Sequence, residues 1–74
     1  MQIRQIASNQ TQLNLRGAEV LFSYETPVAA CLEGGYIRTA TKWSPTTSRH
    51  INSWLDGVIA TEVPQETLDK LVEG

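Results

Sequence analysis

The side chains best suited to binding or catalysis in this 74-residue sequence lie together, at positions 44–52. The stretch holds four hydroxyl side chains, an arginine and a histidine. We predict that it opens a helix, because Ser44 can accept hydrogen bonds from first-turn amides and Pro45 suits the first helical position. A helix start attracts anions through its unpaired amides and partial positive charge. Arg49 could then clamp a phosphate or carboxylate at two points. Hydroxyl donors would come from three neighbours: Thr46, Thr47 and Ser48. A plain helix cap with a solvated arginine explains the same residues.

Catalysis is the weaker interpretation of this stretch. His50 and Ser48 point to different sides of a helix, and no carboxylate is spaced to orient the imidazole. We expect His50 to cover the ring of Trp54, one turn later. One cysteine and one histidine give no metal-ligand spacing, and the pair at 34–35 lacks the lysine of a phosphate loop. Cys31 is expected to be a small buried apolar residue. We therefore expect no enzyme, no metal and no cofactor.

Nucleic-acid binding has one argument in its favour. Positions 46–52 look like the recognition helix of helix-turn-helix regulators. Such a regulator would use Thr46, Thr47, Arg49 and Asn52 to contact bases or phosphates, with Arg38 and Lys42 on phosphates. Against it, positions 28–43 predict a hairpin rather than a supporting helix. The formal net charge of −2 also lacks the basic footprint of a strong nucleic-acid binder. The charges are segregated, however: basic residues outnumber acidic ones in positions 1–50, and the reverse holds in 51–74.

Strands are predicted for most of the first forty residues. Positions 19–25 alternate with the period of two typical of a half-buried strand. Pro27 must lie at an edge or a bulge, because it cannot donate to a ladder. After the apolar run 28–32, two glycines at 34–35 predict a tight hairpin into a strand at 36–43. Ahead of these, Ile3, Ile6, Leu13 and Leu15 indicate a weaker strand or hairpin turning at 8–11.

Two helices follow. Ile51, Trp54, Leu55 and Val58 form one apolar stripe that should lie on the sheet. Gly57 is expected to end this helix in the left-handed conformation. A second helix begins at Pro64 and closes at Gly74. The prediction is one α+β domain over 1–74: a small antiparallel sheet of three to four strands, followed by two helices packed on one face.

Composition limits the class of protein. Hydrophobic residues are 41% and charged residues 19%, which excludes disordered and collagen-like chains. The longest apolar run, 28–32, is far shorter than the ~20 residues of a membrane span. The first six residues lack the apolar stretch of a signal peptide, so we expect a cytoplasmic protein. A core of this size supplies only ~3–5 kcal/mol of net stability, so self-association into a homo-oligomer is an open alternative.

Two stretches resemble a family of short, uncharacterised proteins encoded by bacteriophages and prophages. They are LFSYETPVAA at 21–30 and WSPTTSRHIN at 43–52. The family pattern is Ser-Tyr-x-Thr-x-Val-Ala, then Ser-x-Thr-Thr-Ser-x-His-Ile-Asn, and the resemblance covers roughly residues 20–57. It implies a similar fold, a phage origin and action inside a bacterial host, without an established activity. The matching polar residues are Tyr24, Thr26, Thr46, Thr47, Ser48, His50 and Asn52. They could form one binding surface, or Tyr24 and Thr26 could lock the helix start to the sheet.

The sequence leaves three hypotheses for the function. The leading hypothesis is a non-enzymatic phage accessory protein that binds a host or phage protein and inhibits a host defence function. The alternatives are a small DNA-binding regulator, and an oligomeric protein that sequesters a nucleotide at the helix start 44–49. The candidate binding residues for all three are Tyr24, Arg38, Lys42, Thr46, Thr47, Ser48, Arg49, His50 and Asn52.

Overall fold

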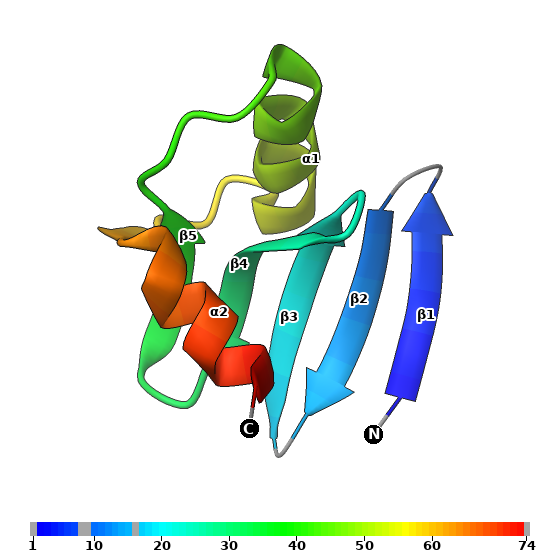
Figure 1. Ribbon diagram of the computed structural model, residues 1–74, viewed down its shortest axis with the longest axis vertical. Coiled ribbons are helices and arrows are strands. Elements are labelled where there is room, and N and C mark those ends of the chain that lie inside the picture. Colours follow the sequence, from blue (N-terminus) through cyan, green and yellow to red (C-terminus); the bar gives the residue numbers. More distant parts are fainter. Residues whose placement is uncertain (1, 8–9, 16, 74) are drawn as a thin grey trace.

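The computed structural model describes residues 2–7, 10–15 and 17–73, and it has α+β architecture (Figure 1). The elements in chain order are β1 (Gln2–Ala7), β2 (Gln10–Leu15), β3 (Ala18–Ser23), β4 (Thr26–Leu32), β5 (Gly35–Thr39), α1 (Pro45–Leu55), β6 (Thr61–Val63) and α2 (Gln65–Glu73). The predicted fold class is confirmed. No helix in the described ranges is long and apolar enough to cross a membrane.

The sheet is larger than the three to four strands predicted. Six strands lie side by side in chain order, and neighbours are antiparallel except β6, which runs parallel to β5. The weak N-terminal pattern forms two full strands, β1 and β2. The turn predicted at 8–11 falls partly outside the described residues, as does the predicted helix end at Gly74. The three-residue strand β6 is too short to show any period.

Strand β5 is shorter than its predicted extent of 36–43. It ends at Thr39, where the chain leaves the sheet for a loop of residues 40–44. The loop start is held by two hydrogen bonds. The Ala40 amide donates to the Val63 carbonyl at 2.8 Å, and the Thr41 amide donates to Thr39 Oγ1 at 3.1 Å. The hairpin before β5 is confirmed, with Leu32 opposite Gly35.

The helices pack on opposite faces of the sheet, so the prediction of a single covered face is wrong. Neighbouring residues of β3 join different core clusters. Val20 is buried with Leu68 of α2, whereas Leu21 is buried with Ile51 of α1. Side chains alternate across a strand, so these two clusters must lie on opposite sides. The physical reason is the uninterrupted apolar run in β4, which needs cover on both faces. Figure 1 views the sheet from the α2 side.

A β-bulge adapts β4 to α1. The register with β3 passes from Leu21 opposite Ala29 to Phe22 opposite Pro27, which leaves Val28 as the extra residue. Val28 and Ala29, although adjacent, both join the core cluster under α1. The prediction that Pro27 sits at an edge or bulge is confirmed. Its carbonyl also accepts a 2.7 Å hydrogen bond from Gln65 Nε2, which ties the start of α2 to β4.

The caps of α1 follow the sequence closely. Ser44 has extended backbone angles, and its Oγ accepts a 3.2 Å hydrogen bond from the Thr47 amide. At the other end Asp56, rather than Gly57 alone, takes a left-handed conformation with φ 48°. Val58 therefore lies beyond the helix, and it is 42% exposed instead of completing the apolar stripe.

The opposite-face packing predicts that α2 is required for stability. Leu68 is the fully buried residue of this short helix. Leu68→Ala should lower the free energy of unfolding by about 2–5 kcal/mol, since it removes buried methyl groups and leaves a cavity. Urea denaturation followed by circular dichroism measures this. The exposed control Lys70→Ala should change stability by less than about 0.5 kcal/mol. Equal effects of the two substitutions would contradict this account of the core.

Candidate functional site

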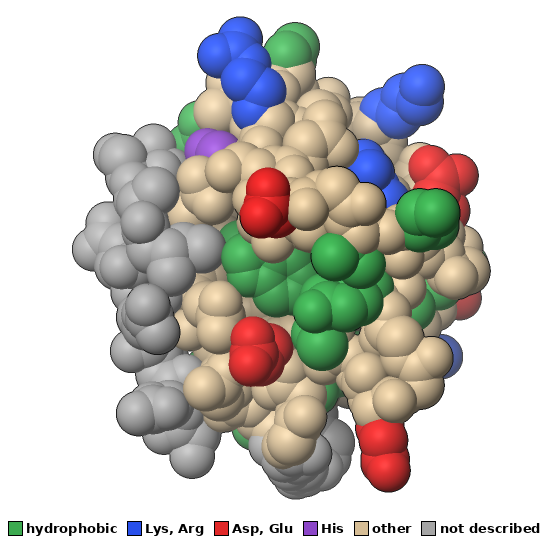
Figure 2. Space-filling view, turned by 180° about the vertical axis from the view of Figure 1, so that it is seen from behind, with side chains coloured by type: hydrophobic (Ala, Val, Ile, Leu, Met, Phe, Trp, Pro, Cys, Tyr) green, Lys and Arg blue, Asp and Glu red, His purple; other side chains and the backbone are tan. Residues whose placement is uncertain are grey.

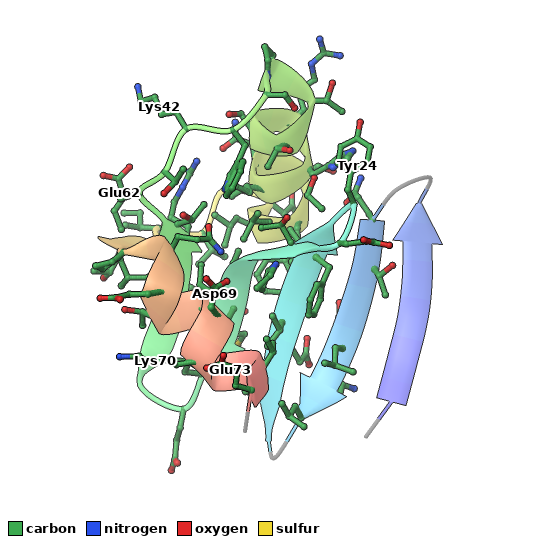
Figure 3. The ribbon with its side chains drawn as sticks, viewed as in Figure 1. Tyr24, Lys42, Glu62, Asp69, Lys70 and Glu73 are labelled. Atoms are coloured by element: carbon green, nitrogen blue, oxygen red, sulfur yellow. The ribbon has the colours of Figure 1, made fainter. Side chains whose placement is uncertain are left out.

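The predicted binding residues surround α1, and the structure separates them into three groups. One group is buried under the helix start, a second lies on the flank that faces β5 and β6, and a third is exposed on the outer side. Figure 3 shows Tyr24 on one flank of α1 and Lys42, in the loop before the helix, on the other. The predicted residues therefore do not form one continuous surface.

The buried group is a hydrogen-bonded cluster of Ser23, Thr47 and His50, called here the polar lock. Ser23 Oγ lies 2.7 Å from His50 Nδ1 and 3.0 Å from Thr47 Oγ1. All three residues are less than a tenth exposed. Buried polar groups need such partners, so the cluster joins the end of β3 to the first turns of α1. The lock interpretation thus has a structural counterpart, but its strand residue is Ser23, which the sequence reading missed.

Tyr24 adds a ring contact to this cluster. It sits in the turn after β3 with φ 60°, and its ring centroid is 6.0 Å from that of His50. We expected the imidazole to meet the Trp54 ring, but it meets Tyr24 instead. Trp54 makes its ring contact with Tyr36.

The second group lines a cavity of about 380 Å³ between β5, the loop 40–44 and α1, called here the basic cavity. Four predicted residues meet there with Thr47 at their side: Arg38, Lys42, Ser48 and Asn52. Arg38 Nη1 donates a long hydrogen bond of 3.4 Å to Asn52 Oδ1. Within the described chain, Arg38 Nε is buried without a partner. The lining also contains one carboxylate, Glu62 of β6.

The third group is exposed on the outer side of the helix. Thr46 and Arg49 are exposed, and neither lines the basic cavity. The first-turn amides are largely occupied, because Ser44 accepts from Thr47 and Ser48 through its side chain and carbonyl, and Pro45 has no amide hydrogen. The first turn of α1 is consequently largely capped by the chain itself, and the basic side chains of Arg38 and Lys42 lie on the flank of the helix.

Sequence reasoning missed a further feature, the aromatic hollow beside the C-terminal end of α1. Its volume is about 540 Å³, and its lining residues are Gln10, Gln12, Glu19, Tyr36, Ser53, Trp54 and Asp56. Tyr36 and Trp54 meet edge to face, with centroids 6.1 Å apart. Trp54 Nε1 donates to Gln12 Oε1 at 3.1 Å, and Gln12 Nε2 donates to Glu19 Oε2 at 3.0 Å. These contacts fix the indole across the sheet.

Cys31 lies beside this hollow and is partly exposed, where we expected it to be buried. Its hydrogen bond with the Tyr36 side chain is the main cause that raises the pKa of the Tyr36 hydroxyl. The nearby Glu19 carboxylate raises the same pKa further. These contacts favour the protonated, neutral form of the Tyr36 hydroxyl.

Two apolar side chains in the segment after α1 are exposed. Ile59 is 93% exposed and Val58 is 42% exposed, and both follow Asp56 in the chain. Figure 2, the view from behind, shows hydrophobic side chains gathered in the middle of the molecule, with acidic side chains above and below them. The sequence shows that Ile59 is a large apolar residue, but only the fold shows that nothing in the described chain covers it.

Metal ligation has no grouped residues to support it in the described part of the chain. No three His, Cys, Asp or Glu side chains come together there.

Comparison with known proteins identifies the family. The model of DUF8033, a family of unknown function, matches residues 1–70, so the chain belongs to this family. No curated protein and no solved structure gave a significant match. The expectation of an uncharacterised family is confirmed at this level. Since the function of this family is unknown, function must be argued from the geometry of the surfaces around α1.

The polar lock generates a stability prediction. Ser23→Ala should lower the free energy of unfolding by about 1–3 kcal/mol, because His50 Nδ1 and the Thr47 hydroxyl lose a buried partner. Chemical denaturation monitored by tryptophan fluorescence measures the change. Ser53→Ala removes a hydroxyl from the exposed side of the same helix and should be close to neutral. If Ser23→Ala were also neutral, the lock would not hold α1 in place.

Proposed function

We propose that this chain is a non-enzymatic bacteriophage protein that acts in the host cytoplasm by binding another protein. The binding surface is the aromatic hollow together with Val58 and Ile59. The observation that carries the proposal is the exposure of Ile59, at 93%, three residues after Asp56 of a hollow with two aromatic side chains. Exposed apolar surface rimmed by polar groups is typical of interaction sites.

The scarcity of apolar residues strengthens this argument. A chain this short has few large hydrophobic side chains, and burying one contributes about 1.5–3 kcal/mol. Folding leaves Ile59, Val58 and part of Trp54 uncovered. A partner that covers these side chains would gain the free energy of their burial on binding. The fold of the monomer does not use that free energy.

Charge defines the kind of partner. Glu19 and Asp56 line the aromatic hollow, and none of the lining side chains that the structure describes is basic. The complementary partner segment carries an apolar side chain to pack against Tyr36 and Trp54, with a lysine or arginine close by. Such charge complementarity steers association and fixes the orientation of the complex.

The geometry of the Ser–His pair supports a non-enzymatic role. Ser23 is 2% exposed and His50 is 8% exposed, so this hydrogen-bonded pair is closed to a substrate. The pair serves the packing of α1 instead. The phage origin and the bacterial cytoplasm are supported by the resemblance of residues 20–57 to phage-encoded proteins. Covering a functional surface of a host defence protein is the inhibitory mechanism that suits a small binding domain.

The residues predicted to contact DNA are separated from one another in the structure. Thr47 is buried in the polar lock, and Asn52 lines the basic cavity, whereas Thr46 and Arg49 are exposed elsewhere. A recognition helix presents its base-contacting residues from one exposed face. The protein-binding proposal is therefore preferred, and DNA binding becomes an outcome of its test.

The proposal predicts that the partner is lost when the apolar surface is made polar. Tagged protein is used to capture partners from nuclease-treated bacterial lysate, and the purified pair is then measured by isothermal titration calorimetry. Ile59→Ser should weaken binding about tenfold or more, as expected for an apolar anchor at an interface. Because Ile59 is almost fully exposed, this substitution leaves the fold intact.

Charge variants provide the matched control. Asp56→Asn removes a carboxylate from the hollow and should weaken binding and slow association at low salt. Glu66→Gln removes an equal charge from α2 and should change neither. Capture that persists unchanged in Ile59→Ser would place the interface elsewhere, and capture that disappears with nuclease would favour nucleic acid. Light scattering of the purified protein separately tests whether a second copy occupies the hollow.

A further inference from the structure

The basic cavity lies on the flank of α1 that faces β5 and β6, and the proposed protein interface does not use it. We infer that this cavity binds a nucleoside monophosphate, with the phosphate held by Arg38 and Lys42 and the base stacked on Trp43. The cavity volume of about 380 Å³ falls within the range of small-molecule sites, roughly 300–1,000 Å³. This inference stands independently of the proposed function.

The state of Arg38 is the first argument. A guanidinium carries five N–H donors. In the described structure Nη1 donates to Asn52 at a long 3.4 Å, and Nε is buried with no partner. The hydrogen-bond donors of Arg38 are thus incompletely satisfied at the cavity wall. A phosphate in the cavity would accept from the terminal nitrogens, which suit oxyanions in a two-point geometry.

Other donors converge on the same space from two elements. Lys42 and Thr41 come from the loop before α1, and Ser48 comes from the second turn of the helix. All three are exposed, so their side chains are free to turn toward a ligand. The amide of Asn52 stands one helical turn after Ser48 on the same flank, because residues four apart share a helix face. Ammonium, hydroxyl and amide groups together match the oxygens of one phosphate and a ribose.

Trp43 supplies the site for a base. It lines the basic cavity and is 46% exposed. Its Nε1 donates to Gln65 Oε1 at 3.2 Å, which fixes the edge of the indole and leaves surface for contact. Stacking on an aromatic face is the usual way in which proteins hold an unpaired base, and every base has such a face. The cavity therefore offers an anion site and a stacking surface within reach of one small ligand.

The charge count favours a single nucleotide over a nucleic-acid strand. Glu62 stands opposite Arg38 in the register of β5 and β6 and lines the cavity together with Lys42, and Figure 3 shows Glu62 and Lys42 on the same side of the molecule. The lining therefore carries two positive charges and one negative charge, and the chain as a whole carries −2. Strands bind by neutralising many phosphates, which this surface is too weakly basic to do. The net positive charge of the cavity lining suits a ligand with a single phosphate.

The test is a titration of the full chain, uniformly labelled with ¹⁵N, followed by NMR. The probes are the four ribonucleoside monophosphates, adenosine, inorganic phosphate and a single-stranded oligonucleotide, each up to about 5 mM, which detects affinities in the millimolar range. A monophosphate should shift the Trp43 indole resonance and the amides of Thr41 and Lys42. The Trp54 indole should not move, because it lies in the aromatic hollow.

Two substitutions separate the cavity from general electrostatics. Lys42→Gln, at an exposed loop position, should weaken monophosphate binding about fivefold or more. Arg49→Gln removes the same charge from α1 outside the cavity and should leave affinity within about twofold. Absence of shifts with all four monophosphates would overturn the inference. Equal losses in both variants, or binding of the oligonucleotide alone, would overturn it as well. The ¹⁵N spectrum of each variant shows directly that it is folded.

Discussion

Burial of β3 and β4 on both faces is the constraint on which the rest of this structure depends. Val20 and Leu21 are adjacent, both are inaccessible to solvent, and they belong to different core clusters. Each face therefore needs its own helix. Since α1 has 11 residues and α2 has 9, neither can cover a six-stranded sheet. Both sides of α1 consequently border on open sheet surface, and the two candidate sites lie there.

Apolar packing alone would not fix how α1 is turned about its own axis, because the hydrophobic effect is not directional. The polar lock supplies that direction. Ser23 bonds His50 at 2.7 Å, so one flank of the helix is tied to the end of β3. With that rotation set, Asn52 meets Arg38 of β5 on the other flank, and Trp54 reaches Gln12 of β2. A rotation of one residue about the helix axis, about 100°, would separate both pairs.

The features predictable from the sequence were those set by neighbours in the chain. Ser44 and Pro45 start α1, and Pro27 lies at a bulge, because capping and the missing proline amide are local effects. The number of strands and the faces covered depend on pairing between distant segments, and local periodicity does not report them. The candidate sites also combine features visible in the sequence with features that depend on distant segments. Arg38 and Lys42 were singled out by charge, whereas the aromatic hollow needed Gln12, Glu19 and Trp54 to be brought together from separate elements.

Charge is arranged by the flanks of α1 rather than by the two halves of the chain. The sequence places basic residues early and acidic residues late, yet the acidic hollow includes Glu19 from β3, and the basic cavity includes Glu62 from β6. The first turn of α1, where an anion would usually bind, is occupied by its own cap from Ser44. Both candidate sites therefore lie along the sides of the helix rather than at its first turn. One short helix, held by a buried histidine, separates an apolar acidic surface from a basic polar one, so each can be altered without disturbing the other.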